Sequence, residues 1–180
     1  FVVGFTDRTP RFDATHVIAT TDKVQGVAAR YRLATGELVW LRDYGAAAYG
    51  EELVAVAARG ARLVAGGTYD GAPVLGGATL PAGGLGDAMV VELDPATGDV
   101  MWARGIAGPL YQQIRQIELT PAGDIAAIGR FAGELPFGPG DAARSIKAVE
   151  LEDAFIVDLE AGGRVRRVRS FGTRFPEKPR

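Results

Sequence analysis

The chain has 180 residues, a formal net charge of −2 and no cysteine. The weak negative charge argues against a nucleic-acid-binding surface, and the lack of cysteine excludes disulfides and thiolate metal sites. No apolar run reaches the roughly 18 residues of a membrane-spanning helix. The 25 glycines are spread over turns, which favours an all-β chain.

The first 24 residues are predicted to be the end of one repeat unit. Phe1–Thr6 aligns with Leu63–Thr68, 62 positions later, so the chain begins inside a repeat. We therefore expect it to be a fragment of a longer protein, in which case a missing signal peptide is uninformative.

The next unit contains a hairpin that occurs twice. Tyr31–Arg42 and Leu93–Arg104 each have the pattern of strand, turn and strand, with Thr-Gly in the turn and alternating apolar residues after it. The two copies align without a gap, and the same offset extends well beyond them. Matched pairs include Trp40 with Trp102, Arg42 with Arg104 and Tyr49 with Tyr111.

Each unit contains four short strand-like segments. In the middle unit these are residues 87–93, 99–106, 113–119 and 124–130. Ala55–Ala65 tempts a helical interpretation, but it aligns with a segment in which Pro121–Asp124 forms a turn between strands. Four antiparallel strands joined by turns are the content of a propeller blade.

The last unit is less regular than the others. Asp153–Leu159 repeats Asp87–Leu93 at a longer spacing of 66 residues, and Arg167 stands where the earlier copies have tryptophan. The basic segment Arg164–Arg169 alternates with valine, which favours a solvated edge strand over a surface for an acidic partner.

These patterns predict an all-β fold of β-propeller repeats, with about three four-stranded antiparallel blades of roughly 62 residues in one partial domain. The predicted parts are the end of one blade (1–24), two blades (25–86 and 87–152), the start of another (153–173) and a tail (174–180). Three blades do not readily close a ring. The chain is therefore expected to belong to a larger propeller, whose remaining blades lie in the same chain or in another.

Two sets of residues resemble known propeller repeats. Four segments resemble the bacterial secreted β-propeller repeats of the SBBP family, namely Gly129–Gly133, Pro136–Gly138, Asp153–Leu159 and Ser170–Gly172. Leu93–Trp102 is similar to the tryptophan-docking hairpin of pyrroloquinoline-quinone-like propellers, which include quinoprotein dehydrogenases and non-catalytic outer-membrane assembly scaffolds. Both resemblances imply radially arranged blades, and the first implies an extracellular or cell-envelope location. The hairpin implies fold and not activity, because catalytic and non-catalytic members share it.

No cluster of residues points to catalysis. His16 is the single histidine, and we interpret it as an incidental loop or strand residue. The acidic pair Glu51–Glu52 and the group Glu150, Glu152 and Asp153 do not recur with polar companions. We interpret them as solvated turn residues rather than a general acid and base. No catalytic, cofactor-binding or metal-binding residue is assigned.

Several recurring residues have a structural interpretation. Asp87 and Asp153 precede equivalent strands, where a recurring carboxylate could bind calcium. A hydrogen-bonding role in a turn is favoured, and no cofactor is expected. Gly83–Gly86 lacks the lysine and following helix of a phosphate loop and is expected to be a flexible connection. Trp40 and Trp102 are expected to pack between neighbouring blades rather than to stack on a ligand.

The alternation within strands predicts which residues share a face. Met89, Val91 and Leu93 should face one side of their sheet, with Val90 and Glu92 on the other. Phe155, Val157 and Leu159 should likewise share one face, opposite Asp158.

The favoured functional hypothesis is a non-enzymatic propeller scaffold or binding module of a secreted or cell-envelope bacterial protein. Its loops would bind an unknown protein or glycan, because the equivalent connections 44–49 and 106–111 differ in sequence. The alternative is a fragment of a propeller enzyme, of quinone-dependent dehydrogenase or lyase type, whose active site lies outside this chain. A third hypothesis is a structural repeat segment of a larger surface protein.

Overall fold

The computed structural model describes residues 1–7, 9, 12, 17–18, 23–45, 49–138, 141, 145–149 and 151–172. Within these ranges the chain forms strands, turns and loops without a helix, so the predicted all-β class is confirmed. No helix in this part of the chain could cross a membrane. His16, Glu150 and the tail 174–180 lie outside the described residues.

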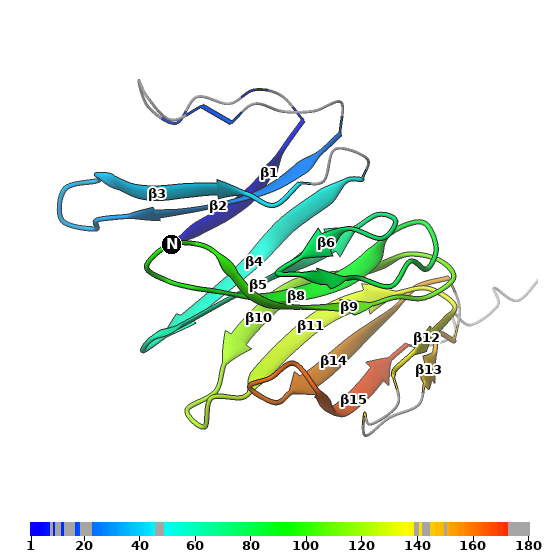
Figure 1. Cartoon of the computed structure of the whole chain (residues 1–180). Coiled ribbons are helices and arrows are strands. Elements are labelled where there is room, and N and C mark those ends of the chain that lie inside the picture. The colour runs from blue at the N-terminus through cyan, green and yellow to red at the C-terminus, as the bar shows by residue number, and fades with distance from the viewer. Residues whose placement is uncertain are drawn as a thin grey trace, which may run out of the picture.

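Three antiparallel sheets follow one another along the chain (Figure 1). Sheet 1 has the order β1-β2-β3, with bounds Val2–Thr6, Gln25–Tyr31 and Leu38–Asp43. Sheet 2 has the order β4-β5-β8-β9, with bounds Glu51–Arg59, Arg62–Tyr69, Asp87–Leu93 and Val100–Ile106. Sheet 3 has the order β10-β11-β14-β15, with bounds Gln112–Leu119, Ile125–Phe131, Asp153–Leu159 and Val165–Phe171. Two small hairpins accompany them, β6–β7 (Val74–Leu75 and Ala78–Thr79) and β12–β13 (Glu134–Pro136 and Ser145–Lys147).

The sheets group the strands differently from the predicted units. Sheet 2 takes β4 and β5 from residues 25–86 and β8 and β9 from residues 87–152, and sheet 3 crosses the boundary at residue 152 in the same way. A periodic series of strands has the same pattern wherever counting begins. Periodicity alone therefore could not show where one sheet ends and the next begins.

Sheet 2 is buried on both faces because the three sheets stack. Met89, Val91 and Leu93 belong to one apolar cluster, which also contains Trp40 of sheet 1. Val90 belongs to a second cluster, which is shared with β10, β11, β14 and β15 of sheet 3. The predicted alternation along this strand is therefore confirmed.

The same alternation holds in sheet 3. Phe155, Val157 and Leu159 are fully buried in the cluster toward sheet 2, and the Phe155 ring meets Phe131 edge-on with centroids 5.8 Å apart. Ala154 and Asp158 are more exposed, because they lie on the face that none of the described residues covers with another sheet.

Sheet 2 contacts its neighbours chiefly through the strands at one edge. Strand β4 contacts β1, β2 and β10, whereas no comparable contacts join the opposite edge strands β3, β9 and β15. The sheets consequently spread apart toward the edge that carries the hairpins 31–42 and 93–104. The described residues thus form three stacked antiparallel sheets and no closed ring.

Two of the aligned pairs are shifted by one residue in the structure. Val2 pairs with Ala29 as Ala65 pairs with Val91, so Phe1–Thr6 aligns one position away from the predicted match with Leu63–Thr68. A one-residue shift exchanges the two faces of a strand. Likewise, the N–H of Asp70 donates to the carbonyl of Gly50, and the equivalent N–H of Ala132 donates to the carbonyl of Tyr111. Gly50, and not Tyr49, is therefore the counterpart of Tyr111.

The two tryptophans join neighbouring sheets, as predicted. A Cβ atom at Gly98 would lie 2.9 Å from the Trp40 ring, and one at Gly163 would lie 2.9 Å from the Trp102 ring. Both glycines have positive φ angles, 79° and 82°, in the turn before the last strand of the next sheet. Each ring therefore packs on a turn in which a side chain would be both strained and obstructed.

Candidate functional site

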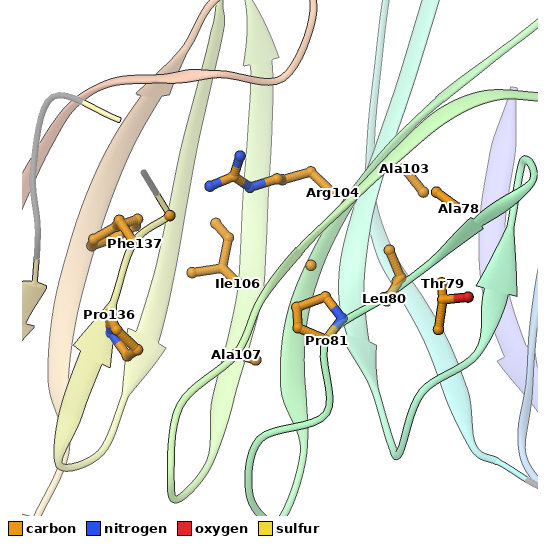
Figure 2. A pocket seen from close by; sticks show the side chains of 12 residues that line it. Ala78, Thr79, Leu80, Pro81, Ala103, Arg104, Ile106, Ala107, Pro136 and Phe137 are labelled. Carbon is orange, nitrogen blue, oxygen red and sulfur yellow. The ribbon is translucent and has the colours of Figure 1, made fainter. Parts of the chain in front are cut away.

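A crevice of about 490 Å³ opens along β9, on the side of sheet 2 that faces sheet 3, between the segments 78–81 and 136–138 (Figure 2). Arg104 and Ile106 on β9 lie in its middle, between Leu80 and Pro81 on one side and Pro136 and Phe137 on the other (Figure 2). The wall is mostly apolar, and Arg104 is the charged residue in it.

Arg104 is held in place by a buried acid. Its guanidinium pairs with Asp141, whose side chain is only 2% exposed. The Asp141 carboxylate also accepts the backbone N–H groups of Gly138 (2.8 Å) and Val165 (2.9 Å). With its carboxylate bonded to three donors, Asp141 anchors Arg104, whose side chain is still 27% exposed. The crevice thus presents a fixed cation beside apolar walls.

Tyr69 fixes the opposite wall. This fully buried side chain donates a hydrogen bond of 2.6 Å from its hydroxyl to the carbonyl of Pro81. Burial raises the pKa of Tyr69 well above its usual value, so the hydroxyl stays protonated and able to donate. Pro81 is therefore held by the core rather than by its own loop.

A smaller crevice of about 300 Å³ lies at the equivalent place between sheets 1 and 2. Its lining includes Tyr44 at the position of Ile106, and Leu75 at the position of Phe137. The Tyr44 hydroxyl donates across the gap to the carbonyl of Gly98, at 2.8 Å. That bond closes part of the smaller crevice, so the larger one is the better candidate for a binding site.

The recurring aspartates bond to the backbone of loops. Asp87, 1% exposed, accepts the N–H groups of Gly83 (2.7 Å) and Gly108 (3.0 Å). Burial raises the pKa of Asp87 although these hydrogen bonds act in the opposite direction. Asp153 accepts the N–H of Val149 at 3.0 Å. These bonds are the turn-stabilising role predicted for both residues.

The acidic residues do not converge, and the prediction that they are solvated turn residues is wrong for Glu51 and Asp153, which are buried within strands β4 and β14. Glu51 is fully buried and Glu52 is half-buried, and as neighbours on β4 they point to opposite faces of the sheet. Glu152 pairs with Arg130 at 3.1 Å. Within the described ranges, no group of three or more histidine, aspartate or glutamate side chains is placed to hold a metal ion.

The glycine-rich loop is packed rather than flexible, contrary to the prediction. A Cβ atom at Gly83 would lie 2.4 Å from the carbonyl oxygen of Gly108, and the N–H of Leu85 donates to Leu110 at 2.9 Å. Glycine is needed here because the two loops approach closely.

The basic segment 164–169 lies on β15, the edge strand of sheet 3, as predicted. Arg166 pairs with Asp124, and Arg167 pairs with Asp158. Opposite charges therefore neutralise much of this edge.

Sequence reasoning missed a charged network between sheets 2 and 3. Arg62 forms two hydrogen bonds of 2.7 Å with Glu92, and the indole N–H of Trp102 donates to the same carboxylate at 2.7 Å. Arg62 also donates to the carbonyls of Gly123 and, at 3.1 Å, Ala161 in sheet 3. The repeat gave no signal for this network, since Arg30 occupies the position equivalent to Glu92. Arg104, by contrast, was visible as the recurrence of Arg42.

A scan against protein-family models and a search of curated proteins both find no match for this chain.

Proposed function

We propose that this chain is part of a non-enzymatic β-propeller scaffold that binds a protein or glycan segment. The crevice between sheets 2 and 3 is the observation that carries the proposal. Its volume of about 490 Å³ falls in the range of ligand-binding sites, roughly 300–1,000 Å³. It is open to solvent along its length, which suits an extended segment better than an enclosed small molecule.

The chemistry of the walls fits such a segment. Pro81, Pro136 and Phe137 offer flat apolar surfaces on which a peptide side chain or a sugar ring can stack. Arg104, anchored by Asp141, offers guanidinium N–H groups to a carbonyl, hydroxyl or carboxylate. Both walls are held by the core, so the geometry exists before a ligand arrives and little ordering entropy is lost on binding.

The resemblance to SBBP repeats supports the same proposal. Gly129–Gly133 spans the end of β11, Pro136–Gly138 forms a wall of the crevice, and Asp153–Leu159 is strand β14. We propose accordingly an extracellular or cell-envelope location, with the remaining blades of the propeller supplied in the same chain or by another.

Binding to a glycan array and to a displayed random peptide library tests the proposal. We expect ligands from one of the two, with affinity lowered about tenfold or more by Phe137→Ala or Arg104→Gln, since each removes a stacking surface or a donor worth about 1–2 kcal/mol. Met101→Ala, at an exposed position on the same strand as Arg104, is the control and should bind normally. Absence of any ligand, or binding unaffected by both crevice variants, would refute the proposed function.

A further inference from the structure

The turn of sheet 1 lacks the contact that its counterparts have in sheets 2 and 3. Gly36 corresponds to Gly98 and Gly163 and has the same left-handed backbone, with φ of 70°. Whereas a tryptophan covers each of those glycines, no described atom lies within 4 Å of a Cβ position at Gly36. Leu33, in the same turn, is fully exposed. Sheet 1 therefore presents an uncovered copy of the docking turn.

The outer face of sheet 3 lacks the cover that the equivalent face of sheet 2 has. Strand register places Ile156 and Phe171 at the positions of Val90 and Ile106, which are buried against sheet 3. Phe171 is 53% exposed, and Ile128, which pairs with Ile156 on the same face, is 41% exposed. The outer face of sheet 3 thus keeps apolar residues at positions that are buried in sheet 2, although no described sheet covers it.

A recurring arginine indicates that a partner of this open face should carry a negative charge. Arg42 lies 3.6 Å from Asp99 of sheet 2, and Arg104 pairs with Asp141 beside sheet 3. Each arginine thus meets a carboxylate beyond its own sheet. Arg169 occupies the third equivalent position, by register opposite Ile156 as Arg104 is opposite Val90, and it is exposed.

The uncovered turn of sheet 1 supplies the matching acid. Glu37 follows Gly36 as Asp99 follows Gly98, and its side chain is 61% exposed. It currently pairs with Arg32 at 2.8 Å, an exposed ion pair of the kind worth little. Glu37 is therefore available to a second arginine.

Arg167 can make the contact that tryptophan makes elsewhere. Trp40 donates to the carbonyl of Pro95, at 3.1 Å, and the residue equivalent to Pro95 in sheet 1 is Leu33. Arginine carries several N–H donors that can reach backbone carbonyls. Arg62 already donates to carbonyls across the gap between sheets 2 and 3, where it reaches Ala161.

We propose that two copies of this chain associate head to tail, with the outer face of sheet 3 of one copy packed on the turn 32–37 of sheet 1 of the other. Arg167 lies on the turn at Gly36, and Arg169 pairs with Glu37. A second copy is the occupant because this chain carries an uncovered docking turn, an uncovered sheet face and, in Arg169 and Glu37, opposite charges at the positions of Arg42 and Asp99. The contact is heterologous, so it generates a ring or an open chain of molecules.

The contacts between sheets support this head-to-tail association, which does not depend on the ligand proposed above. Sedimentation equilibrium of the chain over a wide concentration range is the first test, and we expect concentration-dependent association. Arg169→Glu and Glu37→Arg, each alone, place like charges together and should weaken association about tenfold or more. The two substitutions combined in one chain restore the pair with reversed charges and should return the dissociation constant to within about threefold of the original.

Controls separate this effect from a general change of charge or from unfolding. Glu134→Arg and Lys147→Glu alter a cross-strand pair on the β12–β13 hairpin, outside the four strands of sheet 3 and outside sheet 1, and should leave association unchanged. Ile128→Asp should abolish association while the thermal melting of the monomer persists, since this side chain is already partly exposed. A chain that stays monomeric throughout refutes the proposal. So does an oligomer that the single charge variants do not weaken, or that the combined variant fails to restore.

Discussion

The two interfaces between sheets share one contact and differ in nearly everything around it. In both, a tryptophan ring packs on a turn glycine of the next sheet. Between sheets 1 and 2, Trp40, Arg30 and Tyr44 all donate directly to backbone carbonyls of residues 95–98. Between sheets 2 and 3, the indole N–H of Trp102 bonds within its own sheet to Glu92, and Arg62 crosses instead.

The residue opposite the tryptophan accounts for this difference. Arg30 is itself a donor and can join Trp40 in bonding to Pro95. Glu92 is an acceptor, so it attracts the indole N–H and needs a cation, which β5 provides as Arg62. A single repeat position therefore decides whether the indole N–H bonds across the interface or within its own sheet, while the packing of ring on glycine stays the same.

The largest expected effect is loss of the buried ring. Trp40→Ala should lower the free energy of unfolding by about 3–5 kcal/mol, because the side chain is only 6% exposed and donates to Pro95. Trp102 is half-buried, so Trp102→Ala should cost less, nearer 3 kcal/mol. Urea denaturation of both variants measures the difference, and equal losses would contradict the ranking.

A methyl group on the docking glycine should have the next largest effect. Gly98→Ala destabilises the fold in two ways, because alanine is strained at a positive φ and its Cβ would clash with the Trp40 ring. Gly60→Ala introduces the backbone strain alone, because a Cβ at that position meets open space. We expect Gly98→Ala to exceed Gly60→Ala by about 1–3 kcal/mol in chemical denaturation. Identical losses would mean that the ring moves aside freely.

The charged interface should respond to pH. Burial by itself raises the pKa of Glu92, but the hydrogen bonds from Arg62 and Trp102 and the charge of Arg62 lower it overall, below its ordinary value of 4.5. The ionised carboxylate therefore stabilises the fold fully above about pH 4.5, and this stabilisation is lost as the pH falls through the lower folded-state pKa.

Glu92→Gln tests this dependence. Near neutral pH it should cost about 1–2 kcal/mol, because the ion pair is partly screened by solvent. The loss relative to the unsubstituted chain should shrink as the pH falls below 4.5. Denaturation curves over this pH range measure it, with Arg30→Gln as the control whose effect should not vary with pH. A constant difference for Glu92→Gln would show that the carboxylate is not the stabilising group.

Sequence alone was enough for contacts that recur. The alignment of Trp40 with Trp102 predicted packing between neighbours, and alternation along 89–93 predicted the two buried faces, because both signals are local and repeated. The partner of Arg62 could not be predicted in this way. Ala161 is 99 residues from it, and the position equivalent to Glu92 carries the opposite charge in sheet 1.

Only some residues of the candidate crevice could be singled out from the sequence. Arg104 recurred with Arg42, and Pro136–Gly138 carried the family resemblance, but nothing linked them before the sheets were stacked. The anchoring acid, Asp141, lies outside the repeated strands and 37 residues from Arg104. A site formed between two sheets depends on where each sheet begins, and that is the feature that periodicity leaves open.

The smallest expected effect concerns the hydroxyl of Tyr44, which bonds across the interface between sheets 1 and 2. Burial raises the pKa of Tyr44 well above its usual value, so the hydroxyl stays protonated and donates to Gly98 over the whole working pH range. Tyr44→Phe removes this bond and leaves the Gly98 carbonyl without that donor, at a cost of about 0.5–1.5 kcal/mol. Because no charge is lost, the cost should not change with salt or with pH below 9, whereas that of Glu92→Gln should fall as salt screens the ion pair. Denaturation at low and high salt compares the two variants directly. A salt-dependent loss for Tyr44→Phe would mean that the two interfaces are held together by the same kind of force, and the contrast between them would fail.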